Sequence, residues 1–355
     1  MPHYNLALLG FGNVGRSFAR LLLRKQADLL AQYNLTFAVT GIATGRHGMA
    51  IDLDGLDLER AVAIVEGKGG KGNGKESQPV GTLSSQATSG GRPQAALDFI
   101  RNCGADVLFE NSPVNYQTGQ PAVDHLRTAL EMGMIAITAN KGPVVHAYRS
   151  LTQLAEASGL KFYFESAVMD GAPIFSLFRE TLPAASLRSF RGILNSTTNL
   201  ILTRMESGES FDAAVAYAQS IGVAETDPSG DIDGWDAAVK VAALVTVLMG
   251  IDLKPDQVNR EGIRSITQEE IARARADGKR WKLVCSAERN GNEVIARVAP
   301  EMVPSDSPLY PIEGTTSTCQ FNTDVLDQLS VIEANPGPDT TAYGLLADFI
   351  NAVRR

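Results

Sequence analysis

The residues with the clearest chemical potential lie in one short segment of the second half of the chain. Gly222 to Lys240, GVAETDPSGDIDGWDAAVK, combines a single cation, Lys240, with a series of carboxylates. The carboxylates are Glu225, Asp227, Asp231, Asp233 and Asp236. Acidic side chains suit an ammonium group, because charge-assisted hydrogen bonds are the stronger kind. A lysine can donate a proton to a carbonyl oxygen. The segment is therefore a candidate site of acid and base chemistry.

The local structure of this segment follows from turn and helix signals. Residues 227–230, Asp-Pro-Ser-Gly, predict a turn, because Asp accepts from its own backbone, Pro fixes φ and Gly frees it. A helix should begin at Asp233, as its N-cap, and end before Gly250. Asp236 and Lys240 would then lie one turn apart on one face. The alternative is a solvated acidic loop, followed by an ordinary helix with a weak surface ion pair.

Length and composition limit the possible functions. The chain has 355 residues, 44% hydrophobic and 20% charged, and so can bury a sizeable core in two domains. Its net charge of -8 argues against nucleic acid or an anionic membrane surface as a partner. The 3 cysteines and 4 histidines are scattered, without disulfide or zinc spacing. With no signal peptide pattern and no long apolar run, we expect a soluble, cytoplasmic enzyme.

The N-terminus predicts a dinucleotide site. Tyr4 to Leu9 is an apolar strand, the glycine turn GFGNVG follows it, and a helix with apolar spacing comes next. The residues expected to contact the cofactor here are Gly10, Gly12, Asn13, Val14 and Gly15. The first glycine permits the tight turn, the second admits the pyrophosphate, and the third lets strand and helix pack closely. The N–H groups at the helix start would bind the phosphates.

The end of the second strand bears on the choice of cofactor. After residues 36–43, an NAD enzyme usually carries an acid for the ribose hydroxyls, whereas an NADP enzyme offers an arginine to the 2′-phosphate. This chain has the neutral Thr44 there, and Arg46 follows closely. The pattern favours NADP. An ordinary surface arginine in a turn, with NAD as cofactor, is the alternative.

Two further strands continue a doubly wound parallel sheet of the Rossmann type over residues 1–145. They are expected at residues 105–110 and 134–138, with a helix between them. Asn111 and Ser112 follow the first of these strands, and Lys141 follows the second. All three should lie at the carboxyl edge of the sheet, where open α/β folds bind ligands.

The rest of the chain predicts a second α/β (α+β) domain over residues 146–337. It includes a hairpin around Asn290-Gly291 and a polar run, 195–199, that can cap a helix or bind a carboxylate there. A final helix within 338–355 is expected to complete the first domain. Residues 66–78 and 84–93, rich in Gly, Ser and Lys, are expected to be loops.

Several separated motifs agree with one family. They are GFGNVG, TANKGP from Thr138, ESAVMDGAP from Glu165, GILNSTTN from Gly192, and the acidic segment. The chain resembles homoserine dehydrogenase over nearly its whole length. The resemblance implies reversible reduction of aspartate semialdehyde to homoserine with NAD(P)H, in threonine and methionine biosynthesis. It also implies a homodimer, with the second domain binding substrate and forming the dimer.

The resemblance also implies roles for individual residues. Lys141 and Lys240 would act at the reacting oxygen, Thr197 would lie against the substrate, and the substrate's amino group would lie near Glu225, Asp231 and Asp236. A monovalent cation, Na⁺ or K⁺, would be held by Glu165, Val168, Asp170 and Ala172. The chain departs from the family at Met169-Asp170-Gly171, where a glycine-rich turn is usual.

The chemistry of aldehyde reduction agrees with these roles. It needs a hydride from the nicotinamide and a proton donor at the carbonyl oxygen. We expect Lys240 to be the general acid and base and Lys141 to polarise the carbonyl, although the two roles could be exchanged. Other readings are a reductase of another amino-acid semialdehyde and an NADP-binding sensor. A phosphorylating aldehyde dehydrogenase is disfavoured, because none of these motifs contains a cysteine nucleophile. The sequence also leads us to expect no threonine feedback through an added regulatory domain.

Overall fold

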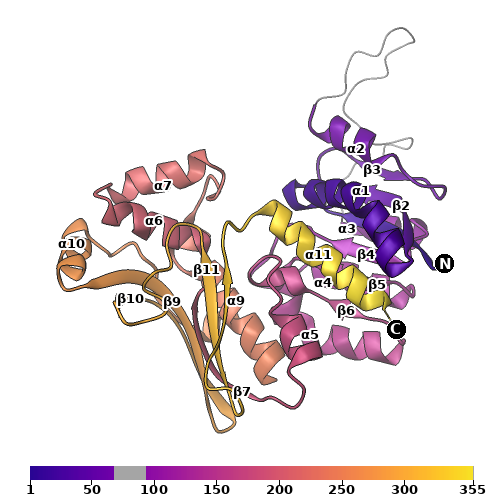
Figure 1. Ribbon diagram of the computed structural model, residues 1–355. Coiled ribbons are helices and arrows are strands. Elements are labelled where there is room, and N and C mark those ends of the chain that lie inside the picture. The colour runs from indigo at the N-terminus through magenta and orange to yellow at the C-terminus, as the bar shows by residue number, and fades with distance from the viewer. Residues whose placement is uncertain (68–92, 355) are drawn as a thin grey trace. The chain divides into compact units, whose positions relative to one another are not determined.

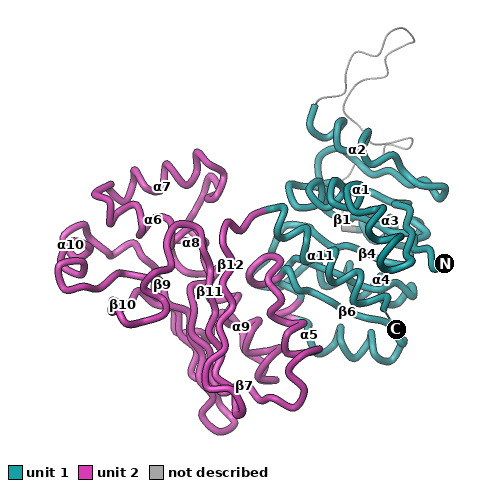
Figure 2. Tube along the Cα trace, in the orientation of Figure 1, with its two compact units in different colours: residues 1–143, 147–166, 338–355 teal, residues 144–146, 167–337 magenta. Residues whose placement is uncertain are grey.

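The computed structural model describes residues 1–67 and 93–354, and the chain divides into two compact units (Figure 2). The first comprises Met1–Pro143, Ala147–Ser166 and Pro338–Arg355, and the second comprises Val144–His146 and Ala167–Gly337. The loops expected at residues 66–78 and 84–93 lie almost entirely outside the described residues. Among the described helices, none is long and apolar enough to cross a membrane.

The first unit is built on a six-stranded sheet of order β3-β2-β1-β4-β5-β6 (Figure 1). Its strands are β1 (His3–Leu9), β2 (Thr36–Ala43), β3 (Met49–Ile51), β4 (Val107–Glu110), β5 (Ile135–Thr138) and β6 (Phe162–Tyr163). Neighbouring strands from β2 to β6 run parallel, which is the arrangement of the Rossmann fold. The predicted doubly wound parallel sheet is therefore confirmed. The antiparallel edge strand β3 was not predicted.

Helices cover both faces of this sheet because the residues of β1 alternate between two cores. The helices are α1 (Asn13–Tyr33), α2 (Leu58–Val65), α3 (Pro93–Asn102), α4 (Ala122–Glu131), α5 (Lys141–Ala157) and α11 (Pro338–Val353). Leu6 and Leu8 pack into a core with α1, α2 and α11. Ala7 and Leu9 pack into another with α3 and α4. Successive side chains of a strand point to opposite faces, so both faces need helical cover.

The C-terminal helix α11 packs against the first sheet. Phe349 makes edge contacts with Tyr4 of β1 and Phe109 of β4, at centroid distances of 5.8 and 6.0 Å. The domain boundary expected after residue 145 falls inside α5. The first unit instead continues to Ser166, because β6 pairs with β5.

The second unit contains a six-stranded sheet of order β12-β11-β7-β9-β10-β8, in which only the short β8–β10 pair is parallel. Its strands are β7 (Leu187–Ile193), β8 (Asn259–Arg260), β9 (Lys279–Asn290), β10 (Glu293–Pro304), β11 (Ser317–Thr323) and β12 (Leu329–Glu333). Its helices are α6 (Ser196–Glu206), α7 (Phe211–Ser220), α8 (Ser229–Ile232), α9 (Trp235–Leu244) and α10 (Gln268–Ala276). Short 3₁₀ or π turns span Glu165–Ala167, Leu177–Thr181, Val245–Met249 and Pro255–Gln257. The predicted hairpin is confirmed as β9 and β10.

The acidic segment folds differently from the prediction at its centre. The helix expected from Asp233 forms as α9, with Gly234 as its N-cap, and a short helix, α8, precedes it where part of a turn was expected. Gly234, with φ 79°, is the residue before α9, and its positive φ breaks the helix. Asp233 is therefore not an N-cap, and its carboxylate pairs with Arg264. The helical run does end at Gly250, as predicted, with φ 68°.

Candidate active site

The glycine turn of the first unit has the geometry of a phosphate cradle. A Cβ on Gly10 would lie 2.3 Å from the backbone oxygen of Asn111, and one on Gly15 would lie 2.4 Å from that of Gly10. These two glycines are needed for close packing. Gly12 precedes α1 and has no neighbouring atom within 4 Å of its missing Cβ. The helix start, with Asn13 and Val14, has no side-chain cap and no acidic residue in its first turn, so its N–H groups can bind an anion.

Asn111 and Ser112 follow β4 at the carboxyl edge of the sheet. Both polar atoms of the Asn111 amide are buried, and neither has a hydrogen-bond partner among the described residues. Buried polar groups are normally paired, so this amide fits a polar ligand such as a dinucleotide. Asn140 fastens the neighbouring loop, because its Nδ2 donates to the Ser112 oxygen at 3.1 Å. Asn140 also caps α5, which begins at Lys141.

Glu110 is a buried carboxylate that was not predicted as part of the site. It is fully buried at the end of β4. Its oxygens accept from the Thr138 hydroxyl and the Ser112 N–H, each at 3.0 Å, and lie 3.5 Å from Nδ1 of the buried His125. Glu110 thereby ties together the loops after β4 and β5. The sequence signal for Glu110 was a charged residue at the end of an apolar strand. A charge buried there needs hydrogen-bond partners nearby.

The turn after β2 contains the residues that bear on cofactor choice. Thr44 is buried, and its hydroxyl accepts from the His47 N–H at 2.6 Å and donates to the Gly48 oxygen at 3.1 Å. The hydroxyl therefore shapes the turn. Arg46 is exposed in the same turn. No acidic residue stands at Thr44, where an NAD enzyme usually has one.

Lys240 and Asp236 form the centre of the second unit's polar cluster. The Lys240 Nζ lies 3.0 Å from Asp236 Oδ2, one helical turn away as predicted, and donates to the Leu194 oxygen at 2.6 Å. Asp236 is only 6% exposed. The alternative of a solvated surface ion pair is therefore wrong.

Asn195, at the start of α6, connects this pair to a second carboxylate. Its Nδ2 donates to Asp231 Oδ1 at 2.6 Å and to Asp236 Oδ2 at 3.0 Å. Thr197 is buried beside it and donates to the Val223 oxygen at 3.3 Å. In the sequence, Asn195 is only part of a polar run. Its position just before a helix indicated that it could cap that helix. The fold thus gathers Thr197, Asp231, Asp236 and Lys240 around Asn195.

Glu225 is placed differently from these residues. It lies in the exposed stretch after α7. Gln219 Nε2 donates to its backbone oxygen at 3.2 Å, rather than to its carboxylate. Its side chain is therefore solvated, while Asp231 and Asp236 are held by Asn195.

The electrostatics of the cluster follow from burial and from an excess of carboxylates. Burial raises the pKa of the Asp231 carboxyl, and the neighbouring Asp236 raises it further, while hydrogen bonds from Asn195 and Thr197 oppose the shift. Glu333, at the end of β12, has its pKa raised to about 7, mainly by burial and then by Asp170. Two carboxylates surround one lysine in this cluster, so an added cationic group would be stabilised there.

The residues expected to bind a monovalent cation belong to both units. Glu165 is part of the first, and Val168, Asp170 and Ala172 are part of the second. Met169 and Asp170 have φ values of 56° and 46°, in the left-handed region that favours glycine. Glycines would adopt this turn without strain. In the described part of the chain, no group of three or more His, Cys, Asp or Glu could hold a metal.

The fold and the two sites together define a class of enzyme. The first unit is a Rossmann fold whose glycine turn leaves space at a helix start, and the second holds a lysine among buried carboxylates. These are the features of an NAD(P)-dependent oxidoreductase acting on a CH–OH group.

Comparisons with known proteins give the family. The homoserine dehydrogenase family model matches residues 173–350. A homoserine dehydrogenase of Methanocaldococcus jannaschii is 36% identical over 98% of both chains. An NAD(+)-dependent homoserine dehydrogenase of Pseudomonas canavaninivorans is 33% identical over 99% of this chain and 96% of that one. A homoserine dehydrogenase structure from Thiobacillus denitrificans has a TM-score of 0.80 at 27% identity, covering 99% of this chain and 73% of the other. The chain belongs to the homoserine dehydrogenase family.

Proposed function

We propose that this protein is a homoserine dehydrogenase, which reversibly reduces L-aspartate 4-semialdehyde to L-homoserine with NAD(P)H. One observation carries the proposal within this family. Lys240 is held by Asp236, and Asn195 holds Asp236 together with a further carboxylate, Asp231. A proton donor beside surplus buried carboxylates suits a substrate that has both a carbonyl group and an ammonium group.

The protein residues would divide the work of catalysis. A bound nicotinamide cofactor supplies or accepts the hydride. Lys240 gives a proton to the carbonyl oxygen during reduction and takes the hydroxyl proton during oxidation. Asp236 and the Leu194 oxygen keep the Lys240 Nζ in place. Asp231 and Asp236 balance the substrate's ammonium group, and Lys141 polarises the carbonyl.

We assign Thr197 and Glu225 secondary roles in binding the substrate. Thr197 is buried at the start of α6, close in sequence to Asn195, and can shape the wall of the site. Glu225 is exposed and would reach the amino group only when a substrate is bound. An exchange of roles between Lys141 and Lys240 is the alternative mechanism. The pH dependence of kcat in each lysine variant distinguishes the two.

NADP is the cofactor that we propose for this chain. Thr44 is neutral, and the exposed Arg46 is available to a 2′-phosphate. The relative from Pseudomonas canavaninivorans, named as NAD(+)-dependent, favours NAD as the alternative. Replacing Arg46 with Ala should lower kcat/KM for NADPH about tenfold, since a charge-assisted bond to phosphate is lost, and leave that for NADH unchanged. Initial rates with both cofactors measure this, and equal use of both cofactors before and after the change would exclude the assignment.

We further propose that Glu165, Val168, Asp170 and Ala172 bind Na⁺ or K⁺. Asp170 brings a negative charge to this turn, and backbone carbonyls suit a monovalent cation. Activity in sodium or potassium salt, compared with tetramethylammonium salt at equal ionic strength, tests the cation. Equal rates in all three salts would contradict this role.

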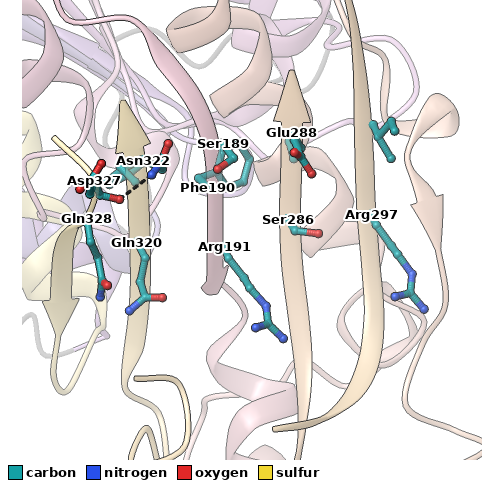
Figure 3. A pocket seen from close by; sticks show the side chains of 13 residues that line it. Ser189, Phe190, Arg191, Ser286, Glu288, Arg297, Gln320, Asn322, Asp327 and Gln328 are labelled. Carbon is teal, nitrogen blue, oxygen red and sulfur yellow. Dashed lines mark hydrogen bonds between the residues drawn. The ribbon is translucent and has the colours of Figure 1, made fainter. Parts of the chain in front are cut away.

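A homodimer requires an interface between its two copies, and we propose that this interface lies on the second sheet. A pocket of about 370 Å³ lies over β7, β9, β10 and β11, where Gln320, Arg191, Ser286 and Arg297 form a row (Figure 3). Glu288 and Asp327 line the same surface. A second copy related by a twofold axis could therefore place cations opposite anions. Sedimentation at micromolar concentration tests this assignment, and a monomer would contradict it.

The experiment that tests the function is a set of initial rates of NADPH and NADH oxidation. Aspartate semialdehyde is compared with other amino-acid semialdehydes and simple aldehydes. Turnover confined to aspartate semialdehyde is the expected result. Preference for another semialdehyde would establish a different reductase, and cofactor binding without any turnover would favour the sensor.

A further inference from the structure

Asn195 uses both the donors and the acceptor of its amide inside the polar cluster. Its side chain is buried between the end of β7 and the start of α6. The Nδ2 group donates to Asp231 and Asp236. The Oδ1 atom accepts from the Thr198 N–H at 2.8 Å and from the Thr198 hydroxyl at 2.9 Å. Both donors of the amide are therefore occupied, and its oxygen accepts from the Thr198 N–H and shares the Thr198 hydroxyl with the Asn195 backbone oxygen at 3.1 Å.

The two carboxylates that share this amide have the same charge and little solvent. Two neighbouring carboxylates tend to keep a proton, because each disfavours ionisation of the other. A hydrogen bond donated to an ionised oxygen opposes this tendency. Asn195 donates one such bond to each carboxylate, and so favours the doubly ionised pair. An ionised pair is the form that binds an ammonium group.

The same amide also affects the position of Lys240. Asp236 Oδ2 accepts a hydrogen bond from the Asn195 Nδ2 at 3.0 Å and pairs with the Lys240 Nζ at 3.0 Å. The backbone oxygen of Leu194, the residue before Asn195, receives a further bond from Nζ at 2.6 Å. The chain around Asn195 therefore fixes Lys240 from two sides.

We propose that Asn195 is a positioning residue for the reaction: its amide holds Asp231 and Asp236 ready for the substrate's ammonium group and sets Asp236 against Lys240. This inference rests on the proposed function, because it concerns the same substrate and the same proton donor. Asn195 acts through its neighbours and does not itself contact the reacting atoms.

The first test is Asn195→Asp, which keeps the shape of the side chain. An aspartate is as good an N-cap as an asparagine, so α6 keeps its start. The variant loses both donors and adds a third carboxylate. With homoserine as substrate, kcat/KM should fall about 100-fold at pH 8, because hydrogen bonds to charged groups are replaced by repulsion. The kcat/KM of the variant should partly recover toward pH 6, where the introduced carboxyl group can take up a proton and donate again, and the wild type should show no such recovery.

Asn199→Asp is the matched control. Asn199 lies one turn further along α6 and is equally buried, and its Nδ2 donates to the Gly314 and Thr316 oxygens at 3.0 and 3.2 Å. The control makes the same chemical change in the same helix without any of the Asp231 and Asp236 contacts. It should lower stability and keep the wild-type shape of the pH profile. The same altered profile in both variants, or a wild-type profile in Asn195→Asp, would overturn the proposal.

A second variant and a second readout keep the inference testable. If Asn195→Asp does not fold, Asn195→Ser keeps a capping hydroxyl and one donor. Its kcat/KM should fall about tenfold with a shifted pH profile, and an unshifted profile would overturn the proposal. Carboxyl NMR titration of Asp231 needs no turnover, and should give a higher pKa in either variant than in the wild type. An unchanged titration would reject the inference, whereas a wild type without homoserine turnover would reject the proposed function alone.

Discussion

Two lysines of the second unit lie in polar clusters that meet α6 one turn apart, and only one of the two lysines is partly exposed. Asn195 connects α6 to the Lys240 cluster, and Asn199 connects it to Lys282. The Lys240 side chain is 16% exposed, whereas Lys282 is fully buried. Asn195 reaches its lysine through Asp236, whereas Asn199 bonds to its lysine directly.

The Lys282 cluster is held by contacts within the second unit. The Lys282 Nζ donates to Asn199 Oδ1 at 3.1 Å and to the Ile312 oxygen. Arg280 pairs with Glu206 at 3.2 Å and also with Glu313. Two cations thus face two carboxylates. Burial lowers the pKa of Lys282 to about 8, and Glu206 opposes the shift.

The difference shows which property indicates chemistry. A buried lysine that bonds to Asn199 and to the Ile312 oxygen fastens the 312–316 stretch to α6. The Lys240 cluster has two carboxylates and one partly exposed lysine, and so lacks one positive charge. The ammonium group of a substrate can supply that charge. Burial and a shifted pKa alone do not identify a site, because structural ion pairs shift pKa values too.

The largest expected effect is on turnover when Lys240 is replaced by Met. We expect kcat for homoserine oxidation to fall about 10²- to 10⁴-fold, which is the usual contribution of a general acid or base. The melting temperature should fall as well, because the buried Asp236 loses the Lys240 cation, although it keeps its bond from Asn195. Initial rates and a melting curve on the same preparation measure both, and a kcat within a factor of about three of the wild type would refute the role of Lys240.

The complementary change, Lys282→Met, should affect stability instead. Glu206 loses a buried cation and two oxygens lose their donor, so the unfolding free energy should fall by about 3 kcal/mol. Turnover at saturating substrate should stay close to that of the wild type. Urea unfolding together with initial rates tests this. Loss of turnover with stability unchanged would break the distinction between the two clusters.

A smaller effect is expected in the pH dependence of stability. The pKa of Lys282 is lowered from its ordinary value of 10.5 to about 8 in the folded protein. Between pH 8 and pH 10.5 the unfolded chain therefore binds more protons than the folded protein. The unfolding free energy of the wild type should therefore rise with pH across this window, relative to Lys282→Met, by roughly 1–3 kcal/mol. Below pH 8 the difference in unfolding free energy between the wild type and Lys282→Met should be constant. A difference that is the same at pH 7 and pH 10 would show that the pKa is not lowered.

Much of the fold could be predicted from the sequence because its signals are local. The glycine turn between a strand and a helix predicted the first unit, and Asn290-Gly291 predicted the hairpin. Asp236 and Lys240 could be paired because helical spacing fixes which residues meet. Strand β3 could not be found, because Met49–Ile51 is too short to show a period.

The clusters around α6 were not predictable in the same way. Asn195 meets Asp231 and Asp236 only because α6, α8 and α9 pack together, and no local pattern encodes that contact. Glu225 was grouped with the aspartates on the family resemblance, yet the chain between α7 and α8 leaves it in solvent. Lys282 lies in an alternating strand, and the sequence does not show that Asn199 will cover it.

The most direct test of the whole account compares L-homoserine with 4-hydroxybutanoate, the same molecule without its amino group, as substrates for NADP⁺ reduction by the wild-type protein. We predict turnover of homoserine, and a kcat/KM about 100-fold lower for 4-hydroxybutanoate, because Asp231 and Asp236 would then have the Lys240 cation without the substrate's ammonium group. Equal use of both compounds, or no reaction with homoserine, would contradict the assignment of this cluster to the substrate's ammonium group.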